Sequence, residues 1–377
     1  MRKQNKDLKI IGITGSYGKT SVKEFLSSIL KEKYNILATP ENINTPIGIA
    51  RLILNNLAKH HEIFIVEMGA YFRGDIKKIC NLVHPEIGIL TGINESHLEK
   101  FKTIENTIKT KFELIESLPK DGLALINGDN KYCAEQILNT KKIIKPVKCK
   151  VKLYSLSVSE SPSGDSDGAG GGDVEIVKVK LANYQQLENL TKFAIIKQNI
   201  KSEFEIRLLG KHNILNILPG ILVGEKLGLT HEQIKRGVVN IKPIPHRLQP
   251  IISKNNILVI DDAYNGNPDG VMAAIEVLAN FSNRRKIFAT PGLVEIGEKR
   301  GEVHKEIGSR LADTADLILL IQNSNTKFFL QGLKEKNYSN DKIKIYQTSQ
   351  KMQEDLKNIL QSGDVILFQN DWPDNYF

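Results

Sequence analysis

A short run of glycines followed by lysine and threonine carries the clearest chemical signal in the sequence. Residues 12–21 read GITGSYGKTS, with the core G-x-x-G-K-T at 15–20. In such a loop, backbone N–H groups can surround phosphate, the lysine can reach the outer phosphates, and the threonine hydroxyl can ligate Mg²⁺. The stricter pattern G-x-x-x-x-G-K-[ST] would need glycine where Ile13 stands. The spacing predicts a phosphate-binding loop; an ordinary glycine-containing turn is the alternative.

An acid at the end of an apolar run is a second candidate for chemistry. Glu67 ends the segment IFIVE, where a carboxylate is poorly placed for packing. One interpretation makes it a Mg²⁺ ligand beside the phosphate loop, because carboxylate oxygens suit that hard cation. The other makes it an exposed acid at the end of a strand.

The elements that must position these residues alternate between strand and helix. Apolar runs at 9–14, 63–68, 86–91 and 122–126 predict strands. Apolar residues recur at helical spacing through 20–33, at Val22, Phe25, Leu26, Ile29 and Leu30. This alternation predicts a mostly parallel, doubly wound α/β sheet.

The pattern changes after about residue 145. Residues 155–173 are rich in Ser, Gly and Asp, which predicts a solvated, flexible loop. Alternation in the segments 174–181 and 193–209 suggests antiparallel strands flanking this loop. Helices are expected at about 213–227 and at 230–239, the second opened by a capping box at Thr230 and Gln233. The segment Pro-Ile-Pro at 243–245 then breaks the chain, and strand–helix alternation restarts. We therefore predict two domains, 1–243 and 244–377.

Composition bounds the class of protein. The chain has 377 residues, 41% of them hydrophobic, which is enough for real cores. A net charge of +9 over this length does not by itself indicate nucleic-acid binding, and no apolar run approaches the ~18 residues of a membrane span. Three cysteines without a C-x-x-C pair favour a reducing, cytoplasmic compartment.

Six segments together resemble a known family. They are TGSYGKT (14–20), ATPENINT (38–45), VEMGA (66–70), HLE (97–99), GKHNILN (210–216) and DDAYNGNP (261–268). The set is similar to the Mur ligases, ATP-dependent amide ligases of peptidoglycan precursor synthesis, and among them to those that add D-alanyl-D-alanine. The matches run in the family's order from residue 12 to about 305.

The resemblance implies a fold and a reaction. It implies a central P-loop ATPase domain, with a mostly parallel sheet and additional antiparallel strands, followed by a Rossmann-like α/β domain that closes over it. ATP would convert a substrate carboxylate into an acyl phosphate, which an amine attacks to give an amide, ADP and phosphate. The implied substrates are a muramoyl-peptide carboxylate and an amine such as D-alanyl-D-alanine.

The resemblance also implies roles for individual residues. The implied catalytic residues are Lys19, His97, Lys111 and Arg247, and the implied ligands of two Mg²⁺ ions are Thr20, Glu67, His97 and Lys111. The implied nucleotide-binding residues are Gly15, Ser16, Tyr17, Gly18, Lys19, Thr20, Ser21, Asn213, Asn216, Arg247 and Asp262. The implied substrate-binding residues are Asn42, Asn44, Thr45, Tyr264, Asn265 and Asn267. Asn213 could instead cap its helix, and Asn42, Asn44 and Thr45 could simply form a turn.

Two lysines compete for the family's carbamylated lysine. Lys109 lies four residues from both Glu105 and Glu113, the arrangement of a solvated ion-pair ladder. Lys111 shares its helix face with apolar residues, so burial should lower its pKa and give the neutral amine that reacts with CO₂. The motif Lys-Phe-Glu at 111–113 agrees, and we predict carbamylation at Lys111.

The chain departs from the family pattern in three places. The family's Gly-Asp-Met segment is replaced by Thr-Pro-Gly-Leu at 290–293, and its Lys-Gly-Ser-Arg by Phe-Gln-Asn-Asp at 368–371. Because the resemblance begins at residue 12, we expect the family's N-terminal uridine-binding domain to be missing. We therefore expect that a partner chain supplies this domain, that uridine recognition is lost, or that the substrate differs, for example by being lipid-linked.

Three rival functions follow from the same residues. One is a ligase of this type for another peptide or a polyglutamate-like substrate. Another is a non-catalytic nucleotide-binding scaffold, which would not need the two implied metal sites. The third is a nucleic-acid-dependent ATPase, which would show basic patches with interleaved aromatic residues; the sequence has none.

Overall fold

The structure of the chain is a computed structural model, which describes residues 7–41, 43–95, 101–138, 143–156, 174–253, 255–264, 266–294 and 296–370. Most of the predicted loop 155–173 lies outside these ranges. The chain forms two compact units, each described by itself: the first contains Met1–Tyr184, Lys192–Ile206 and Asn213–Ile241, and the second contains Gln185–Thr191, Arg207–His212 and Lys242–Phe377.

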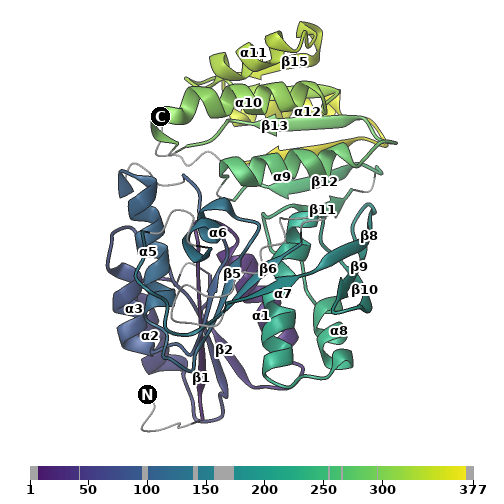
Figure 1. Ribbon diagram of the computed structural model, residues 1–377. Helices are drawn as coiled ribbons and strands as arrows, with labels where there is room; N and C mark the ends of the chain where they lie inside the picture. Colours follow the sequence, from purple (N-terminus) through teal and green to yellow (C-terminus); the bar gives the residue numbers. More distant parts are fainter. Residues whose placement is uncertain are drawn as a thin grey trace. The chain divides into compact units, whose positions relative to one another are not determined.

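A seven-stranded parallel sheet is the centre of the first unit (Figure 1). Its strand order is β2-β3-β1-β4-β5-β6-β7, and every neighbouring pair is parallel. The strands are β1 (Lys9–Thr14), β2 (Ile36–Ala38), β3 (Ile63–Glu67), β4 (Ile87–Leu90), β5 (Leu123–Asn127), β6 (Lys150–Ser155) and β7 (Val174–Lys178). The predicted mostly parallel sheet is confirmed.

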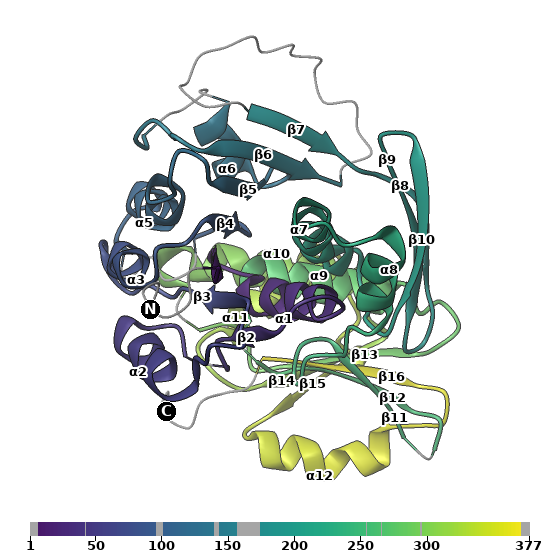
Figure 2. The same cartoon turned by 90° about the horizontal axis from the view of Figure 1, so that it is seen from below.

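Helices cover both faces of this sheet, as Figures 1 and 2 show. One face carries α2 (Pro46–Asn56), α3 (Asp75–Val83) and α5 (Ile104–Glu116), whose apolar residues join one buried cluster with those of the strands. The other face carries α1 (Lys19–Leu30), α7 (Lys211–Lys226) and α8 (His231–Val239). A short helix, α6 (Lys131–Ile137), follows β5. The apolar positions predicted for the first helix are all buried in α1.

The region after β6 differs from the sequence prediction. Residues 174–181 do not form one antiparallel strand: β7 extends the parallel sheet beside β6, and β8 (Lys180–Gln186) begins a separate three-stranded sheet. That sheet continues through β9 (Thr191–Lys197) and β10 (Ile200–Ile206). Gln198 and Asn199, both with positive φ, form the two-residue turn between them, which suits an antiparallel hairpin. Alternating hydrophobicity alone cannot distinguish an edge strand of one sheet from the first strand of another.

A second sheet, of six strands, organises the second unit. Its order is β11-β12-β16-β13-β14-β15, with only the β11–β12 pair antiparallel. The strands are β11 (Gln249–Ile252), β12 (Leu258–Asp262), β13 (Lys286–Thr290), β14 (Leu317–Ile321), β15 (Ile343–Tyr346) and β16 (Val365–Gln369). The helices are α9 (Pro268–Ala279), α10 (Arg300–Ala312), α11 (Thr326–Glu335) and α12 (Ser349–Ile359), with 3₁₀ turns at Gly297–Lys299 and Asn340–Lys342. The predicted Rossmann-like α/β fold is confirmed.

Successive residues of these strands face opposite layers. Phe288 and Leu367 join the cluster under α9, α10 and α11, whereas Ile287 and Ile366 join the cluster under α12. Figure 2 shows α12 alone on its face of the sheet. Both faces of the sheet are therefore covered, as parallel strands require.

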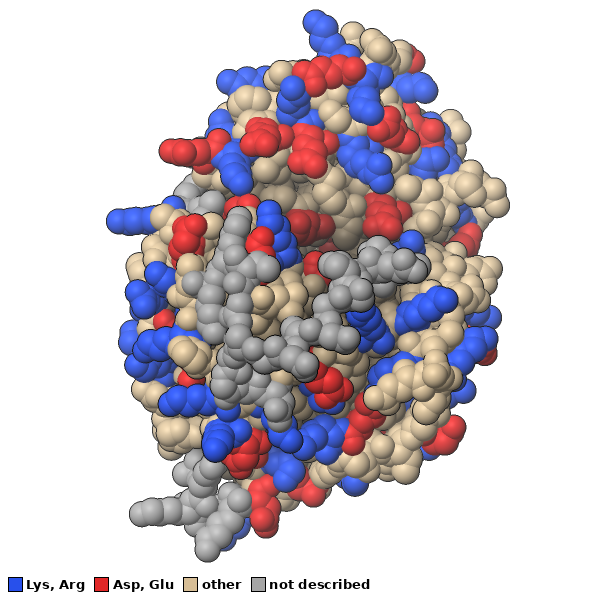
Figure 3. All heavy atoms as spheres, in the orientation of Figure 1, with Lys and Arg blue, Asp and Glu red and all other residues tan. Residues whose placement is uncertain are grey.

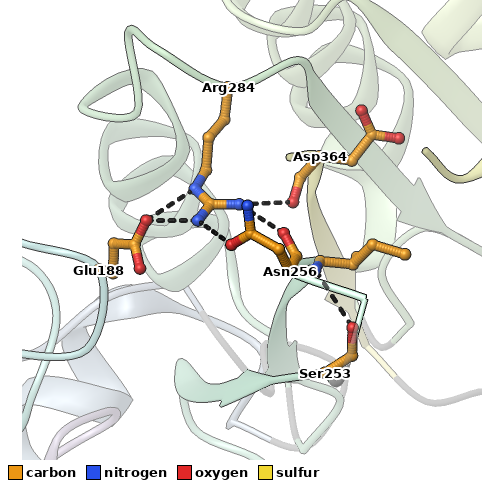
Figure 4. Close-up of polar contacts among 6 residues, drawn as sticks. Glu188, Ser253, Asn256, Arg284 and Asp364 are labelled. Carbon is orange, nitrogen blue, oxygen red and sulfur yellow. Dashed lines mark hydrogen bonds and ion pairs between the residues drawn. The ribbon is translucent and has the colours of Figure 1, made fainter. Parts of the chain in front are cut away.

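The turn between β8 and β9 is bound within the second unit. Arg284 donates hydrogen bonds to the Glu188 carboxylate of this turn, to the Asn256 side chain and backbone, and to the Asp364 backbone carbonyl (Figure 4). Its side chain is only 9% exposed. A buried guanidinium with this many acceptors is well satisfied, so the turn is firmly attached to its unit.

Three further features of the structure concern its surface charge, its cysteines and its helices. On the face shown in Figure 3, basic and acidic side chains are interspersed. Cys80, Cys133 and Cys149 are buried and free. In the ranges given above, no helix is long and apolar enough to cross a membrane.

Candidate nucleotide and metal site

The predicted phosphate loop joins the carboxyl end of β1 to the start of α1. Gly18 has φ 73° at the N-cap of α1, a conformation that favours glycine. A Cβ on Gly15 would lie 2.1 Å from Oγ1 of Thr91, so only glycine fits that approach. The ordinary-turn alternative does not account for the helix that starts directly after Gly18, where free N–H groups and the helix dipole favour an anion.

The segment after β4 supports this loop. The N–H of Ser16 donates to the carbonyl of Gly92 at 2.8 Å, and the Thr91 hydroxyl donates to the carbonyl of Tyr17. The Tyr17 hydroxyl accepts a hydrogen bond from Nδ2 of Asn130 at 3.1 Å. The loop is therefore held in shape before any ligand binds.

Lys19 folds back onto the loop that it follows. Its Nζ donates to the carbonyl of Gly15 at 2.9 Å and is half-buried. Thr20, the next residue, is also half-buried in the first turn of α1. Both side chains lie at the helix start, where phosphate and its cation would be bound.

Glu67 lies at the end of β3, next to β1. It is the residue paired with Ile13 in the parallel register, and it is 5% exposed. Its N–H donates to Oγ1 of Thr39 at 3.0 Å, which fixes the backbone at this point. The alternative of an exposed strand-end acid is wrong.

The oxygens near the loop suit a hard cation. Oε2 of Glu67 is buried and, among the described residues, accepts no hydrogen bond. A buried carboxylate oxygen that accepts no hydrogen bond, at the end of the strand beside β1, matches the oxygen ligands of Mg²⁺. His97 lies outside the described residues, and within those residues no group of three His, Cys, Asp or Glu side chains forms a metal cluster.

Lys111 behaves as its helix face predicted. It is 4% exposed in α5, and its Nζ lies 5.7 Å from the ring centroid of Phe101. Burial, together with the Lys19 ammonium, lowers the pKa of Lys111 to about 7, against an opposing effect of the Glu113 carboxylate. Lys109 is only half-buried. A pKa of about 7 leaves part of the Lys111 amine neutral at neutral pH.

Glu113 has a different role from the ion pair predicted for it. Its carboxylate accepts hydrogen bonds from the N–H groups of Gly74 (2.7 Å) and Lys77 (2.9 Å) at the start of α3. A carboxylate there satisfies free N–H groups and faces the positive end of the helix. Glu113 thus ties α5 to α3.

Asn213 and Asn216 lie inside α7. This helix begins at Lys211, so Asn213 lies in its first turn and Asn216 in the second. Asn213 is buried, and Oδ1 of Asn216 would lie 3.1 Å from a Cβ on Gly18. The amide of Asn216 thus borders the phosphate loop.

The predicted substrate loop lies at the end of β3. The carbonyl of Asn44 accepts a hydrogen bond from Gly69, and Asn44 Oδ1 would lie 2.7 Å from a Cβ on that glycine. Thr45 caps α2, accepting from the N–H of Gly48 at 3.3 Å. Asn42 lies outside the described residues. The capping hydrogen bond of Thr45 is a structural role of the kind expected if this loop is simply a turn.

In the second unit, Arg247 and Asp262 lie near each other. The Arg247 guanidinium lies 5.0 Å from the Tyr264 ring centroid, a cation–π contact. Oδ1 of Asp262 accepts from the N–H of Leu248 at 3.1 Å. Burial raises the pKa of the Asp262 carboxyl to about 7, although the Leu248 hydrogen bond and Arg247 lower it.

The neighbours of this pair have separate partners. Asp261, predicted to face away from Asp262, contacts Nδ1 of His246 at 2.8 Å. Asn267 caps α9 by accepting from the N–H of Gly270 at 3.1 Å. Asn265 lies outside the described residues.

His304, which is buried in α10, supports the segment that precedes this helix. Nε2 of His304 accepts from the N–H of Leu293 at 2.9 Å, so Nδ1 carries the proton and donates to the carbonyl of Arg300 at 2.6 Å. Burial lowers the pKa of His304, which keeps it in this neutral form. His304 therefore holds the segment 290–293 in place.

The two segments of the second unit that depart from the family pattern contact each other. Nδ2 of Asn370 donates to the carbonyl of Gly292 at 2.6 Å, and the Thr290 hydroxyl donates to Oε1 of Gln369 at 2.9 Å. Segments 290–293 and 369–370 are therefore matched to each other. Nothing in the sequence indicated this contact, since the segments are almost eighty residues apart.

The fold and this site define a class of protein: an α/β nucleotide-binding protein with a phosphate loop and a second, Rossmann-like unit. Two family models match the chain, the Mur ligase middle domain over residues 13–224 and the Mur ligase, glutamate ligase domain over residues 246–369. The chain belongs to the Mur ligase family, the ATP-dependent, ADP-forming ligases. The resemblance and the predicted enzyme class are confirmed.

The chain is similar to relatives and to a solved structure that carry one enzyme name within this family. UDP-N-acetylmuramoyl-tripeptide--D-alanyl-D-alanine ligase of Bacillus subtilis is 27% identical over 363 residues, 96% of this chain and 72% of that protein. The enzyme of the same name from a Buchnera aphidicola subspecies is 31% identical over 361 residues, 95% of this chain and 71% of that protein. A crystal structure of MurF from Acinetobacter baumannii superposes with a TM-score of 0.79 at 26% identity, covering 98% of this chain and 75% of that one.

Proposed function

We propose that this chain joins D-alanyl-D-alanine to a UDP-N-acetylmuramoyl-tripeptide, with ATP converted to ADP and phosphate. The observation that carries the proposal is the set of groups around one sheet edge: a preformed phosphate loop, buried Glu67 beside it, and buried Lys111 within electrostatic reach of Lys19. The substrates are those named for the relatives described above. Such a reaction takes place on cytoplasmic precursors, and the free cysteines agree with that compartment.

The reaction has two bond-forming steps. An oxygen of the tripeptide carboxylate attacks the γ-phosphorus of ATP, the bond to the β–γ bridging oxygen breaks, and ADP leaves. The amine then attacks the carbonyl carbon of the acyl phosphate, the bond between that carbon and the phosphate oxygen breaks, and the nitrogen loses a proton as the amide forms. Positioning and charge stabilisation are the main tasks of the protein in such phosphoryl transfer.

The phosphate loop binds and orients the nucleotide. In our proposal the phosphates are surrounded by backbone N–H groups of the loop, those of Gly15, Ser16, Tyr17, Gly18, Lys19, Thr20 and Ser21. Lys19 exchanges its contact with the Gly15 carbonyl for the outer phosphates, where its charge opposes the charge of the transferred group. The amide groups of Asn213 and Asn216 contact the adenine edge.

Thr20, Glu67, His97 and Lys111 are proposed to hold two Mg²⁺ ions. When bound, Mg²⁺ neutralises phosphate charge. The neutral amine of Lys111 adds to CO₂, its nitrogen forming a bond to carbon and losing a proton, and the resulting carbamate supplies oxygen ligands. The buried position and lowered pKa of Lys111 support this assignment over Lys109.

Residues of the second unit are proposed to complete recognition. Arg247 contacts the γ-phosphate and Asp262 the ribose hydroxyls, to which a carboxylate is a good acceptor. Asn42, Asn44 and Thr45 of the first unit, with Tyr264, Asn265 and Asn267 of the second, contact the peptide substrates. Asn267 would do so with the part of its amide that does not cap α9.

The test measures ADP and amide product with Mg·ATP against a panel of muramoyl peptides and amines. We expect stoichiometric ADP and amide only when a UDP-N-acetylmuramoyl-tripeptide and D-alanyl-D-alanine are both present, and loss of both products in Lys19→Met. Equal stimulation by a glutamate-type amine would favour the ligase for another substrate. Nucleotide binding without product from any pair would favour the scaffold.

A further inference from the structure

Lys23 is a buried lysine one helical turn after Lys19. Its side chain is completely inaccessible to solvent in the middle of α1. Lysine is almost never fully buried unless it is paired, because desolvating an ammonium group is costly. The reason for its burial therefore lies in what its Nζ faces.

Nζ of Lys23 faces two carboxylates. It lies 3.4 Å from Oε2 of Glu67, which is itself buried, and 3.3 Å from Oε1 of Glu24, whose side chain is 46% exposed. Solvent screens the Glu24 interaction, so the Glu67 pair is the stronger of the two. Lys23 is thus mainly the counter-charge of Glu67.

The pair is close but not saturated. Among the described residues, neither Nζ of Lys23 nor Oε2 of Glu67 has a hydrogen-bond partner. A buried ion pair without supporting hydrogen bonds recovers little of its desolvation cost. The same carboxylate oxygen therefore remains able to take a second cation.

We propose that Lys23 is a positioning residue for the cation site. It holds the Glu67 carboxylate in place before the metal binds, and it lowers the affinity of that carboxylate for the metal. This inference rests on the proposed role of Glu67 as a metal ligand. Two cations that share one carboxylate repel each other, so the metal binds more weakly with Lys23 present than without it. The metal can then leave with the spent nucleotide.

The test replaces Lys23 by methionine, which keeps the length of the side chain and removes its charge. Mn²⁺ is the probe, and its binding in the presence of ADP is followed by the loss of the free-ion electron paramagnetic resonance signal. We expect Lys23→Met to bind Mn²⁺ at least about tenfold more tightly than the wild type, since one unit charge a few ångströms away is removed. Its melting temperature should fall without metal and rise more steeply than the wild type's as Mg²⁺ is added.

Three further variants make the test specific. Glu24→Gln removes the exposed partner of Lys23 and should leave Mn²⁺ affinity at the wild-type value. Lys23→Arg keeps the charge and should also stay within about threefold of the wild type. Lys23→Gln removes the charge and keeps a donor toward Glu67, so it provides the test if Lys23→Met does not fold. Unchanged Mn²⁺ affinity in Lys23→Met, or tenfold tighter binding in Lys23→Arg, would overturn the proposal.

Glu67→Gln separates this inference from the assignment beneath it. If Glu67 is a ligand, this variant binds Mn²⁺ more weakly than the wild type, whatever Lys23 does. Unchanged binding in Glu67→Gln would overturn the metal-ligand assignment and this inference with it. Weakened binding in Glu67→Gln together with unchanged binding in Lys23→Met would overturn only the role of Lys23.

Discussion

At the scale of single residues, burial changes both the reactivity of Lys111 and its effect on stability. Its pKa is about 7 in the folded protein and near 10.5 in the unfolded chain, so the unfolded chain binds the extra proton between these values. Stability must then rise with pH from about 7 to about 10. Below pH 7 the full penalty for burying the charged Lys111 amine applies, and it lowers the free energy of unfolding by up to roughly 5 kcal/mol.

Lys111→Met removes this penalty and the proposed carbamate together. We expect urea denaturation to give a larger gain in unfolding free energy relative to wild type at pH 6.5 than at pH 9.5, and amide formation to fall at least about a hundredfold. Lys109→Met is the matched control and should change neither. A loss of activity in Lys109→Met with normal turnover in Lys111→Met would reverse the assignment.

Asp262 titrates in the opposite sense. Burial raises the pKa of its carboxyl from 3.8 to about 7, so the folded protein binds a proton that the unfolded chain has released. Stability should therefore fall as pH rises from about 4 to about 7, and Asp262→Asn should stabilise the protein by up to a few kcal/mol at pH 8 but little at pH 4.5.

The same substitution should weaken nucleotide binding by roughly tenfold, because an amide is a poorer partner for ribose hydroxyls than a carboxylate. Chemical denaturation and calorimetric titration with ADP at pH 8 measure the two effects. Asp261→Asn is the control for the second. A destabilised Asp262→Asn at pH 8 would show that the Asp262 carboxylate stabilises the fold.

Residue-level prediction succeeded where helical spacing was sufficient. The burial of Lys111 follows from its apolar face on one helix, and the placement of Glu67 from the end of one strand. Lys23 was missed, although it shares a helix face with Lys19, because its partner Glu67 lies more than forty residues away. Lysines at helical spacing are usually solvated, and only the tertiary structure shows the exception.

At the scale of elements, one glycine of α11 allows α10 and α11 to pack closely. A Cβ on Gly332 would lie 2.0 Å from the carbonyl oxygen of Lys305 and 2.8 Å from the backbone nitrogen of Ser309. Both neighbours are backbone atoms, so the helices must move apart to accommodate alanine. Gly332→Ala should lower the unfolding free energy by about 2 kcal/mol or more, measured by urea denaturation.

Gly301→Ala is the matched control in α10. Its Cβ would meet only the Phe328 side chain, at 3.0 Å, and alanine favours a helix. This variant should stay within about 1 kcal/mol of the wild type. An equal loss in the two variants would mean that the close approach of α10 and α11 does not limit stability.

Element-level prediction succeeded for the strands that carry the site and failed at the sheet edges. The strand predicted at 9–14 coincides with β1, because its apolar run ends at a glycine-rich loop. The three-residue strand β2 and the exposed strand β15 carry too little apolar signal to be predicted. Pairing of β7 with β6 depends on a partner strand, which local alternation does not specify.

At the scale of the whole molecule, we propose that the chain activates a carboxylate as an acyl phosphate before an amine attacks it. The most direct measurement uses a UDP-N-acetylmuramoyl-tripeptide labelled with ¹⁸O in its terminal carboxylate, together with ATP and D-alanyl-D-alanine. Mass spectrometry of the released phosphate should find one ¹⁸O atom per amide formed. Phosphate without ¹⁸O, or release of AMP and pyrophosphate in place of ADP, would contradict the claim.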